Sequence, residues 1–104
     1  MDSPIHIALK DLPKNGRGIK VTVNGEEVAV FRVAREIFAV SNVCPHQHFS
    51  RIHEGMIEGA VVTCPMHGWS FDLRSGACVN GSGSLRQYKV TPHEDEIIVE
   101  LPGP

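Results

Sequence analysis

Short runs of this chain alternate apolar and polar residues, which is the period of a half-buried β-strand. Two such runs, from Ile19 to Val23 and from Glu27 to Val33, flank the dipeptide Asn24-Gly25. Both residues of an Asn-Gly pair tolerate a positive φ, so the pattern predicts a β-hairpin with its turn there. A further strand is predicted from Glu36 to Val40, after the charged turn Ala34-Arg35.

The second half of the chain continues this pattern. The strands predicted there are Ile57 to Thr63, Trp69 to Leu73, Gln87 to Thr91 and Glu96 to Leu101. The last two should form a hairpin around His93-Glu94-Asp95. No stretch carries a long helical period. Short strands between Gly, Asn and Pro turns predict an all-β fold, an antiparallel sandwich or a small barrel.

Length and charge narrow the class of protein. The chain has 104 residues, a common size for one domain, so we expect a single domain over 1–104. A formal net charge of -2 gives no polycationic surface for nucleic acid or an anionic membrane. No run approaches the roughly eighteen apolar residues of a membrane span. The segment from Met1 to Lys10 lacks the basic start and long apolar stretch of a signal peptide.

Two short motifs carry the candidate chemistry: Cys44-Pro45-His46 and Cys64-Pro65-Met66-His67. Each is a tight loop that offers one thiolate and one imidazole, and residues 47–63 separate the two loops. Two sulfur and two nitrogen donors that converge on one point predict a metal site.

Two kinds of metal site use such a donor set. One is a closed tetrahedral zinc site, and the other is a [2Fe–2S] cluster in which two histidines replace two cysteines on one iron. Zinc fingers usually pair like with like, whereas here a single residue separates Cys44 from His46. That spacing is awkward for one tetrahedral ion but suits loops that each reach two irons. The sequence therefore favours the cluster, with a zinc-stabilised interaction module as the alternative.

The motif pair resembles the Rieske family, down to the proline after each cysteine and Gly68 after the second histidine. By that resemblance, Cys44 and Cys64 hold one iron of a Rieske-type 2Fe-2S cluster, and His46 and His67 hold the other.

The same resemblance implies the layout of the domain, and the cysteine count bears on its compartment. It implies an all-β domain of antiparallel sheets, with a cluster-binding subdomain at about residues 42–73 formed by the two loops. With Cys44 and Cys64 assigned to the cluster, Cys78 has no cysteine left to pair with, which fits a reducing cytoplasm. We expect Cys78 to be a small buried hydrophobe.

Departures from the family pattern bear on the reduction potential. High-potential members carry two further cysteines that form a disulfide, and Phe49 and Met66 occupy those positions here. They also carry a serine and a tyrosine hydroxyl where this chain has Trp69 and Phe71. With fewer donors near the cluster, we predict a potential at the low end of the Rieske range of about -150 to +300 mV. Trp69 and Phe71 should instead pack beneath the loops.

The resemblance implies a soluble, low-potential ferredoxin rather than an enzyme. It would carry single electrons from a flavin-dependent reductase to a terminal, ring-hydroxylating-type oxygenase or another redox enzyme. A chain of 104 residues leaves no room for the mononuclear-iron domain of such an oxygenase. The alternative is a small Rieske subunit of a larger redox enzyme, resembling the nitrite reductase small subunit. Some proteins of that group lack the cluster ligands, which this chain keeps.

The other histidines take plainer interpretations. His48 is expected to lie near the cluster edge without being a ligand. His6, His53 and His93 stand in no pattern, so we expect them to be solvated.

Overall fold

The computed structural model describes residues 4–13, 16–45, 50–65 and 68–100. Within them, nine strands form three antiparallel sheets of three strands each, in the orders β1-β9-β8, β2-β3-β4 and β5-β6-β7. The strands are β1 (Ile5–Ala8), β2 (Ile19–Val23), β3 (Glu26–Val33), β4 (Glu36–Ser41), β5 (Met56–Glu58), β6 (Val61–Thr63), β7 (Ser70–Asp72), β8 (Lys89–His93) and β9 (Glu96–Glu100). Two short 3-10 turns, η1 (Leu9–Asp11) and η2 (Ile52–Glu54), complete the described elements. The predicted all-β, antiparallel class is therefore confirmed.

The sheet β2-β3-β4 forms the central layer of the molecule. Its middle strand β3 buries Val28 and Val30 in one core, together with Ile97 and Val99 of β9. Side chains of neighbouring strand residues point to opposite faces, and the intervening Ala29 and Phe31 belong to a second core. Both faces of β3 are thus covered, which explains its nearly continuous apolar sequence.

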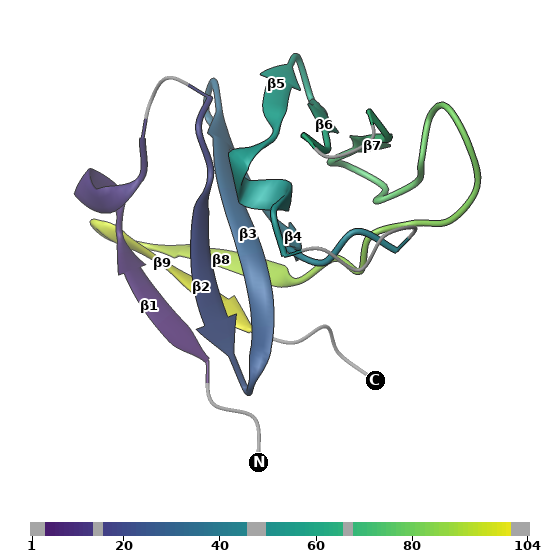
Figure 1. Ribbon diagram of the computed structural model, residues 1–104. Coiled ribbons are helices and arrows are strands. Elements are labelled where there is room, and N and C mark those ends of the chain that lie inside the picture. The colour runs from purple at the N-terminus through teal and green to yellow at the C-terminus, as the bar shows by residue number, and fades with distance from the viewer. Residues whose placement is uncertain (1–3, 14–15, 46–49, 66–67, 101–104) are drawn as a thin grey trace.

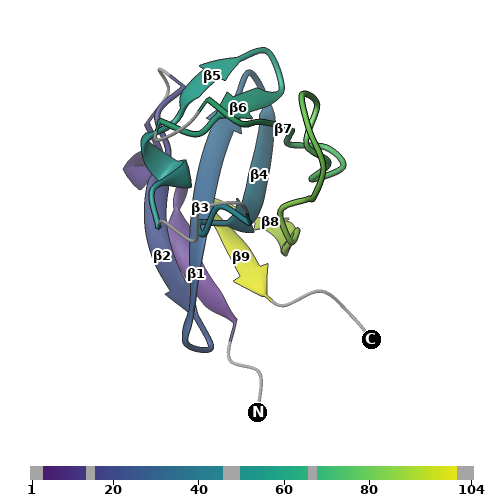
Figure 2. The same ribbon diagram turned by 45° about the vertical axis from the view of Figure 1, so that its right-hand side comes forward.

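The second core connects the central sheet to the small sheet β5-β6-β7. It includes Ile52 of η2, Val62 of β6 and Phe71 of β7, all fully buried. Figures 1 and 2 both show this small sheet at one end of β3, with the long connection after β7 alongside it. The small sheet and its connections therefore pack on the central layer through a shared core.

Most predicted hairpins are present, and two departures from the predicted strands occur. Asn24 and Gly25 adopt φ values of 50° and 82° in the β2–β3 turn, as an Asn-Gly hairpin requires. The single strand predicted from Ile57 to Thr63 is wrong, because Gly59, at φ 60°, reverses the chain and Glu58 pairs with Val61. Strand β1 was not expected; its short apolar run is held by pairing with β9 rather than by a pattern of its own.

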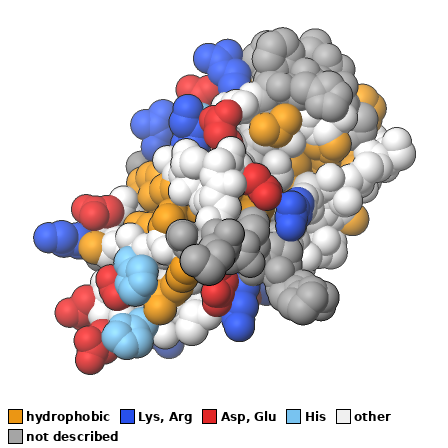
Figure 3. Space-filling view, turned by 90° about the horizontal axis from the view of Figure 1, so that it is seen from below, with side chains coloured by type: hydrophobic (Ala, Val, Ile, Leu, Met, Phe, Trp, Pro, Cys, Tyr) orange, Lys and Arg blue, Asp and Glu red, His pale blue; other side chains and the backbone are white. Residues whose placement is uncertain are grey.

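The surface carries charges of both signs. Figure 3 shows Lys and Arg side chains interspersed with Asp and Glu side chains on the face seen from below. His6 and His93 are exposed, as expected, and their Nδ1 atoms lie 2.8 Å and 3.8 Å from Oε1 of Glu96. No helix in the described part of the chain is both long and apolar enough to cross a membrane.

Candidate metal centre

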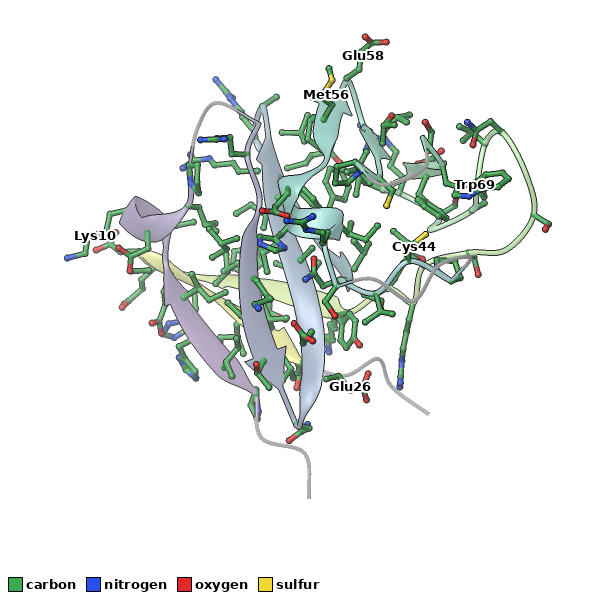
Figure 4. The ribbon with its side chains drawn as sticks, viewed as in Figure 1. Lys10, Glu26, Cys44, Met56, Glu58 and Trp69 are labelled. Carbon is green, nitrogen blue, oxygen red and sulfur yellow. The ribbon has the colours of Figure 1, made fainter. Side chains whose placement is uncertain are left out.

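Both predicted cysteine ligands leave the ends of strands and enter one core. Cys44 follows β4 after two intervening residues, and Cys64 directly follows β6. Their side chains are buried, with exposed fractions of 0% and 1%, in the same packed cluster as Phe71. Folding thus places two cysteines that are twenty residues apart in the sequence in one core. Figure 4 shows Cys44 on the same side of the molecule as Trp69, beside the small sheet.

The two predicted histidine ligands, His46 and His67, lie outside the described residues, as do His48, Phe49 and Met66. The structure places the chain on either side of them. Pro45 and Ser50 bracket the first loop, and Pro65 and Gly68 bracket the second.

Asn42 organises the base of the first loop. Its backbone N–H donates to Glu27 O at 3.0 Å, and its own carbonyl accepts the Ile52 N–H at 3.2 Å. Its side-chain Nδ2 donates to Ser50 O at 2.9 Å, and its Oδ1 accepts the His53 backbone N–H at 2.7 Å. These bonds satisfy a fully buried polar side chain and hold the two ends of the loop together.

Two residues at the base of the first loop, His53 and Asn42, make contacts that the sequence did not predict. His53 is not simply solvated: it is only partly exposed, and its Nδ1 lies 3.1 Å from Asn42 Oδ1. The role of Asn42 was missed in the sequence. An Asn between a strand and a loop is a recognised signal for side chain–backbone bonding, but its partners cannot be read from the sequence.

A carboxylate on the central sheet anchors the far end of the first loop. Oε2 of Glu27 accepts a hydrogen bond from the Ser50 hydroxyl at 2.9 Å, and Lys20 Nζ lies 3.4 Å from Oε1. The Ser50 hydrogen bond, with a smaller contribution from Lys20, holds the pKa of the Glu27 carboxyl below its usual value. Glu27 is therefore an ionised acceptor for this loop at neutral pH.

The second loop closes as the turn of the β6–β7 hairpin. The Cys64 N–H donates to Trp69 O at 2.7 Å, and the Gly68 N–H donates to Cys64 O at 3.1 Å. Gly68 has φ 74°, which a glycine adopts without strain. Below the turn, the hydroxyls of Thr63 and Ser70 lie 2.8 Å apart.

The aromatic residues near the second loop pack as predicted. Phe71 is fully buried in the core that holds both cysteines, and Trp69 is partly buried against it. Cys78 is only partly buried, so the expectation of a buried hydrophobe is confirmed in part. Its backbone forms a bridge with Phe71.

The donor set and its setting fit an iron–sulfur cluster. Thiolates are the usual ligands of such clusters, and both cysteines lie in an apolar core from which water is largely excluded. Backbone hydrogen bonds hold the chain at the base of each loop. The fold and site define an all-β domain with two buried cysteines at the bases of two loops, a setting that suits a metal centre.

The chain belongs to the Rieske family, because residues 5–91 match the family model of the Rieske [2Fe-2S] domain. Its cofactor is accordingly a Rieske-type 2Fe-2S cluster rather than zinc. A relative from Pseudomonas aeruginosa, the ferredoxin component of a naphthalene 1,2-dioxygenase system, is 32% identical over 97 residues, covering 91% of each chain. Proteins of this kind transfer electrons and are not the catalytic components of their systems.

Solved structures with a similar fold include two ferredoxins and a nitrite reductase small subunit. The ferredoxin of carbazole 1,9a-dioxygenase from Nocardioides aromaticivorans IC177 superposes with a TM-score of 0.86 at 29% identity, over 97% of this chain and 99% of that one. A protein described as an NADH-dependent nitrite reductase small subunit, from Mycobacterium tuberculosis, gives 0.89 at 25% identity, over 100% and 99%. A ferredoxin solved in complex with the carbazole 1,9a-dioxygenase oxygenase gives 0.80 at 28% identity, over 89% and 96%.

Proposed function

We propose that this protein is a low-potential Rieske-type ferredoxin that carries single electrons from a flavin-dependent reductase to a terminal oxygenase of the ring-hydroxylating type. The observation that carries the proposal is end-to-end similarity to the ferredoxin component of a dioxygenase system, with 91% of each chain covered. A structural relative of the same fold forms a complex with its oxygenase, which supports the choice of acceptor.

We further propose that Cys44 and Cys64 hold one iron and that His46 and His67 hold the other. The burial of both cysteines in one core supports the first pair. The position of each histidine in the loop that carries a cysteine supports the second. When bound, such a cluster supplies a one-electron couple whose potential lies above that of all-cysteine clusters. The chain contributes buried thiols, braced loops and an apolar surround.

The layout and location of the domain form part of the proposal. The whole chain is one domain, with a cluster-binding subdomain at about residues 42–73. Strands β5 to β7 and both cysteine loops fall within that range. We place the protein in the cytoplasm, because Cys78 is the one cysteine outside the proposed ligand set. Fractionation of cells of the source organism tests this placement.

Electron paramagnetic resonance of the dithionite-reduced protein tests the cluster and its ligands. The expected result is an anisotropic signal with nitrogen couplings from two imidazoles, together with two irons and two acid-labile sulfides per chain. A colourless protein with one zinc and no sulfide would overturn the proposal. An all-cysteine type of signal would overturn the ligand assignment alone.

Close structural similarity to a nitrite reductase small subunit supports a second candidate, a subunit of a larger redox enzyme. The two candidates differ in whether the isolated chain exchanges electrons. A ferredoxin should be reduced by a flavin-dependent reductase with NADH and reoxidised by a separate oxygenase. A subunit should instead co-purify in fixed stoichiometry with a large catalytic chain.

A further inference from the structure

The side chain of Asn80 bonds to the second ligand loop from outside the proposed ligand set. Its Nδ2 donates to Gly68 O at 3.0 Å, and its Oδ1 accepts the Ser70 N–H at 2.9 Å. A backbone carbonyl only accepts and a backbone N–H only donates, so these partners fix which amide atom is oxygen. The Cys78 thiol, 3.5 Å from the same Oδ1, is consistent with that orientation.

The carboxamide of Asn80 takes the place of a peptide group in a strand ladder. Residue 78 forms a bridge with Phe71, and the Val79 N–H donates to Ser70 O at 2.8 Å. Beyond Val79 the Asn80 side chain supplies the next acceptor and donor along this edge. The ladder is thereby extended as far as Gly68, the residue that follows the proposed ligand His67.

The neighbouring Gly81 contacts the same segment through Trp69. A Cβ atom added at Gly81 would overlap Cζ3 of the Trp69 ring. The indole therefore lies directly against the Gly81 backbone, a contact that any larger residue would displace. Asn80 thus bonds to the peptide groups on either side of Trp69, while Gly81 contacts its ring.

We propose that Asn80 is a positioning residue of the cluster site, which fixes the chain where it leaves the second ligand loop. The inference rests on the proposed function, since it assigns the retention and ligand geometry of the cluster partly to this amide. Asn80 is exposed, so its removal should disturb the loop more than the overall stability. The charge-neutral amide also places no formal charge near the cluster.

Three variants of the cluster-loaded protein separate the two hydrogen bonds of Asn80, the one from Ser70 N–H and the one to Gly68 O. Asn80→Ala removes both bonds to the loop. Asn80→Asp keeps an acceptor for the Ser70 N–H but replaces the donor to Gly68 O with a second oxygen. Ser82→Ala, at an exposed position of the same connection, is the matched control.

The first measurement is the rate at which a chelator removes iron from the oxidised protein. Loss of about 1 kcal/mol of hydrogen bonding corresponds to about a fivefold faster release, which we expect for Asn80→Ala and Asn80→Asp but not for Ser82→Ala.

The second measurement is hydrogen–deuterium exchange at the Ser70 amide, which should accelerate in Asn80→Ala and stay protected in Asn80→Asp. The third is the resonance spectrum of the reduced cluster, whose g-values and nitrogen couplings should shift in both Asn80 variants.

Unchanged iron release and g-values in both Asn80 variants, with Ser70 exchange like that of the control, would overturn the inference while leaving the ferredoxin proposal intact. A fall in thermal stability without any change in the cluster signals would also overturn it, because Asn80 would then be merely structural. Failure of the unsubstituted protein to hold a Rieske-type cluster would instead refute the proposed function. If Asn80→Ala does not fold, iron release and g-values are compared between Asn80→Asp and Ser82→Ala. Equal values in these two variants would then overturn the inference.

Discussion

Asn42 and His53 are joined at the base of the first loop, where Asn42 Oδ1 accepts the His53 backbone N–H at 2.7 Å. The same amide donates to Ser50 O, so one buried side chain spans the point where the loop leaves β4 and returns to η2. The loop is therefore anchored on one side by a strand and on the other by a 3-10 turn.

Replacing Asn42 with alanine should destabilise the fold strongly. The change leaves the partly buried His53 N–H and Ser50 carbonyl without their partner, and we expect a loss of about 2–3 kcal/mol in the free energy of unfolding. Urea denaturation of the cluster-loaded protein measures it. His53→Ala, which removes the ring but keeps the backbone N–H bond, is the control, and its free energy of unfolding should fall less. Equal losses in the two variants would contradict the assignment to the amide.

Cysteine substitutions should separate proposed ligands from the remaining thiol. Cys44→Ser and Cys64→Ser each remove a thiolate from the shared core and should abolish the visible absorption of the cluster. Cys78→Ser changes a partly buried thiol outside the proposed ligand set and should retain the cluster. Iron and sulfide content per chain gives the readout. A cluster lost equally in Cys78→Ser would show that the assignment of the two cysteines is incomplete.

The reduction potential should lie at the low end of the Rieske range and rise when a hydroxyl donor is added. Phe71→Tyr introduces an O–H at a position where high-potential relatives carry one, while the ring keeps its place in the core. A hydrogen bond that favours the reduced cluster by about 1 kcal/mol raises a one-electron potential by roughly 40 mV. Trp69→Phe, which adds no donor, is the control for altered packing. Redox titration should give the unsubstituted protein a midpoint below zero, and a midpoint well above zero would contradict the prediction.

The contribution of Glu27 should disappear in acid. Because the Ser50 hydroxyl and Lys20 lower the pKa of Glu27 from its ordinary value of 4.5, the ionised form is favoured by folding. The contribution is therefore fully present above about pH 4.5 and is lost as the pH falls through the lower folded pKa. Glu27→Gln should be less stable than the unsubstituted protein at neutral pH, with the difference shrinking below pH 4.5. Urea denaturation of both proteins from neutral pH to below pH 4.5 measures this difference in stability. A difference that does not change with pH would argue against ionisation of Glu27 as the cause.

Local signals in the sequence predicted the hairpins, because a turn dipeptide such as Asn24-Gly25 acts on its immediate neighbours. The paired motifs likewise predicted two cysteines in one site, and both enter one core. The break at Gly59 was missed because one glycine between apolar residues is compatible with a continuous strand.

The parts of the site that the sequence did not predict depend on residues brought together by folding. Asn42 bonds to a residue eleven positions away, and Asn80 to one twelve positions away. No spacing rule connects an amide to such partners; they become neighbours only after the strands have paired. Strand β1 was missed for the same reason, since its partner β9 lies at the other end of the described chain.

Strand β3 contributes Val28 and Val30 to one core and Ala29 and Phe31 to the other. Because β3 belongs to both cores, the small sheet and its cysteine loops should not unfold while the other two sheets stay folded. We therefore expect heat or denaturant to bleach the iron centre and melt the β-sheet signal at the same midpoint, so that colour reports on the integrity of the whole molecule.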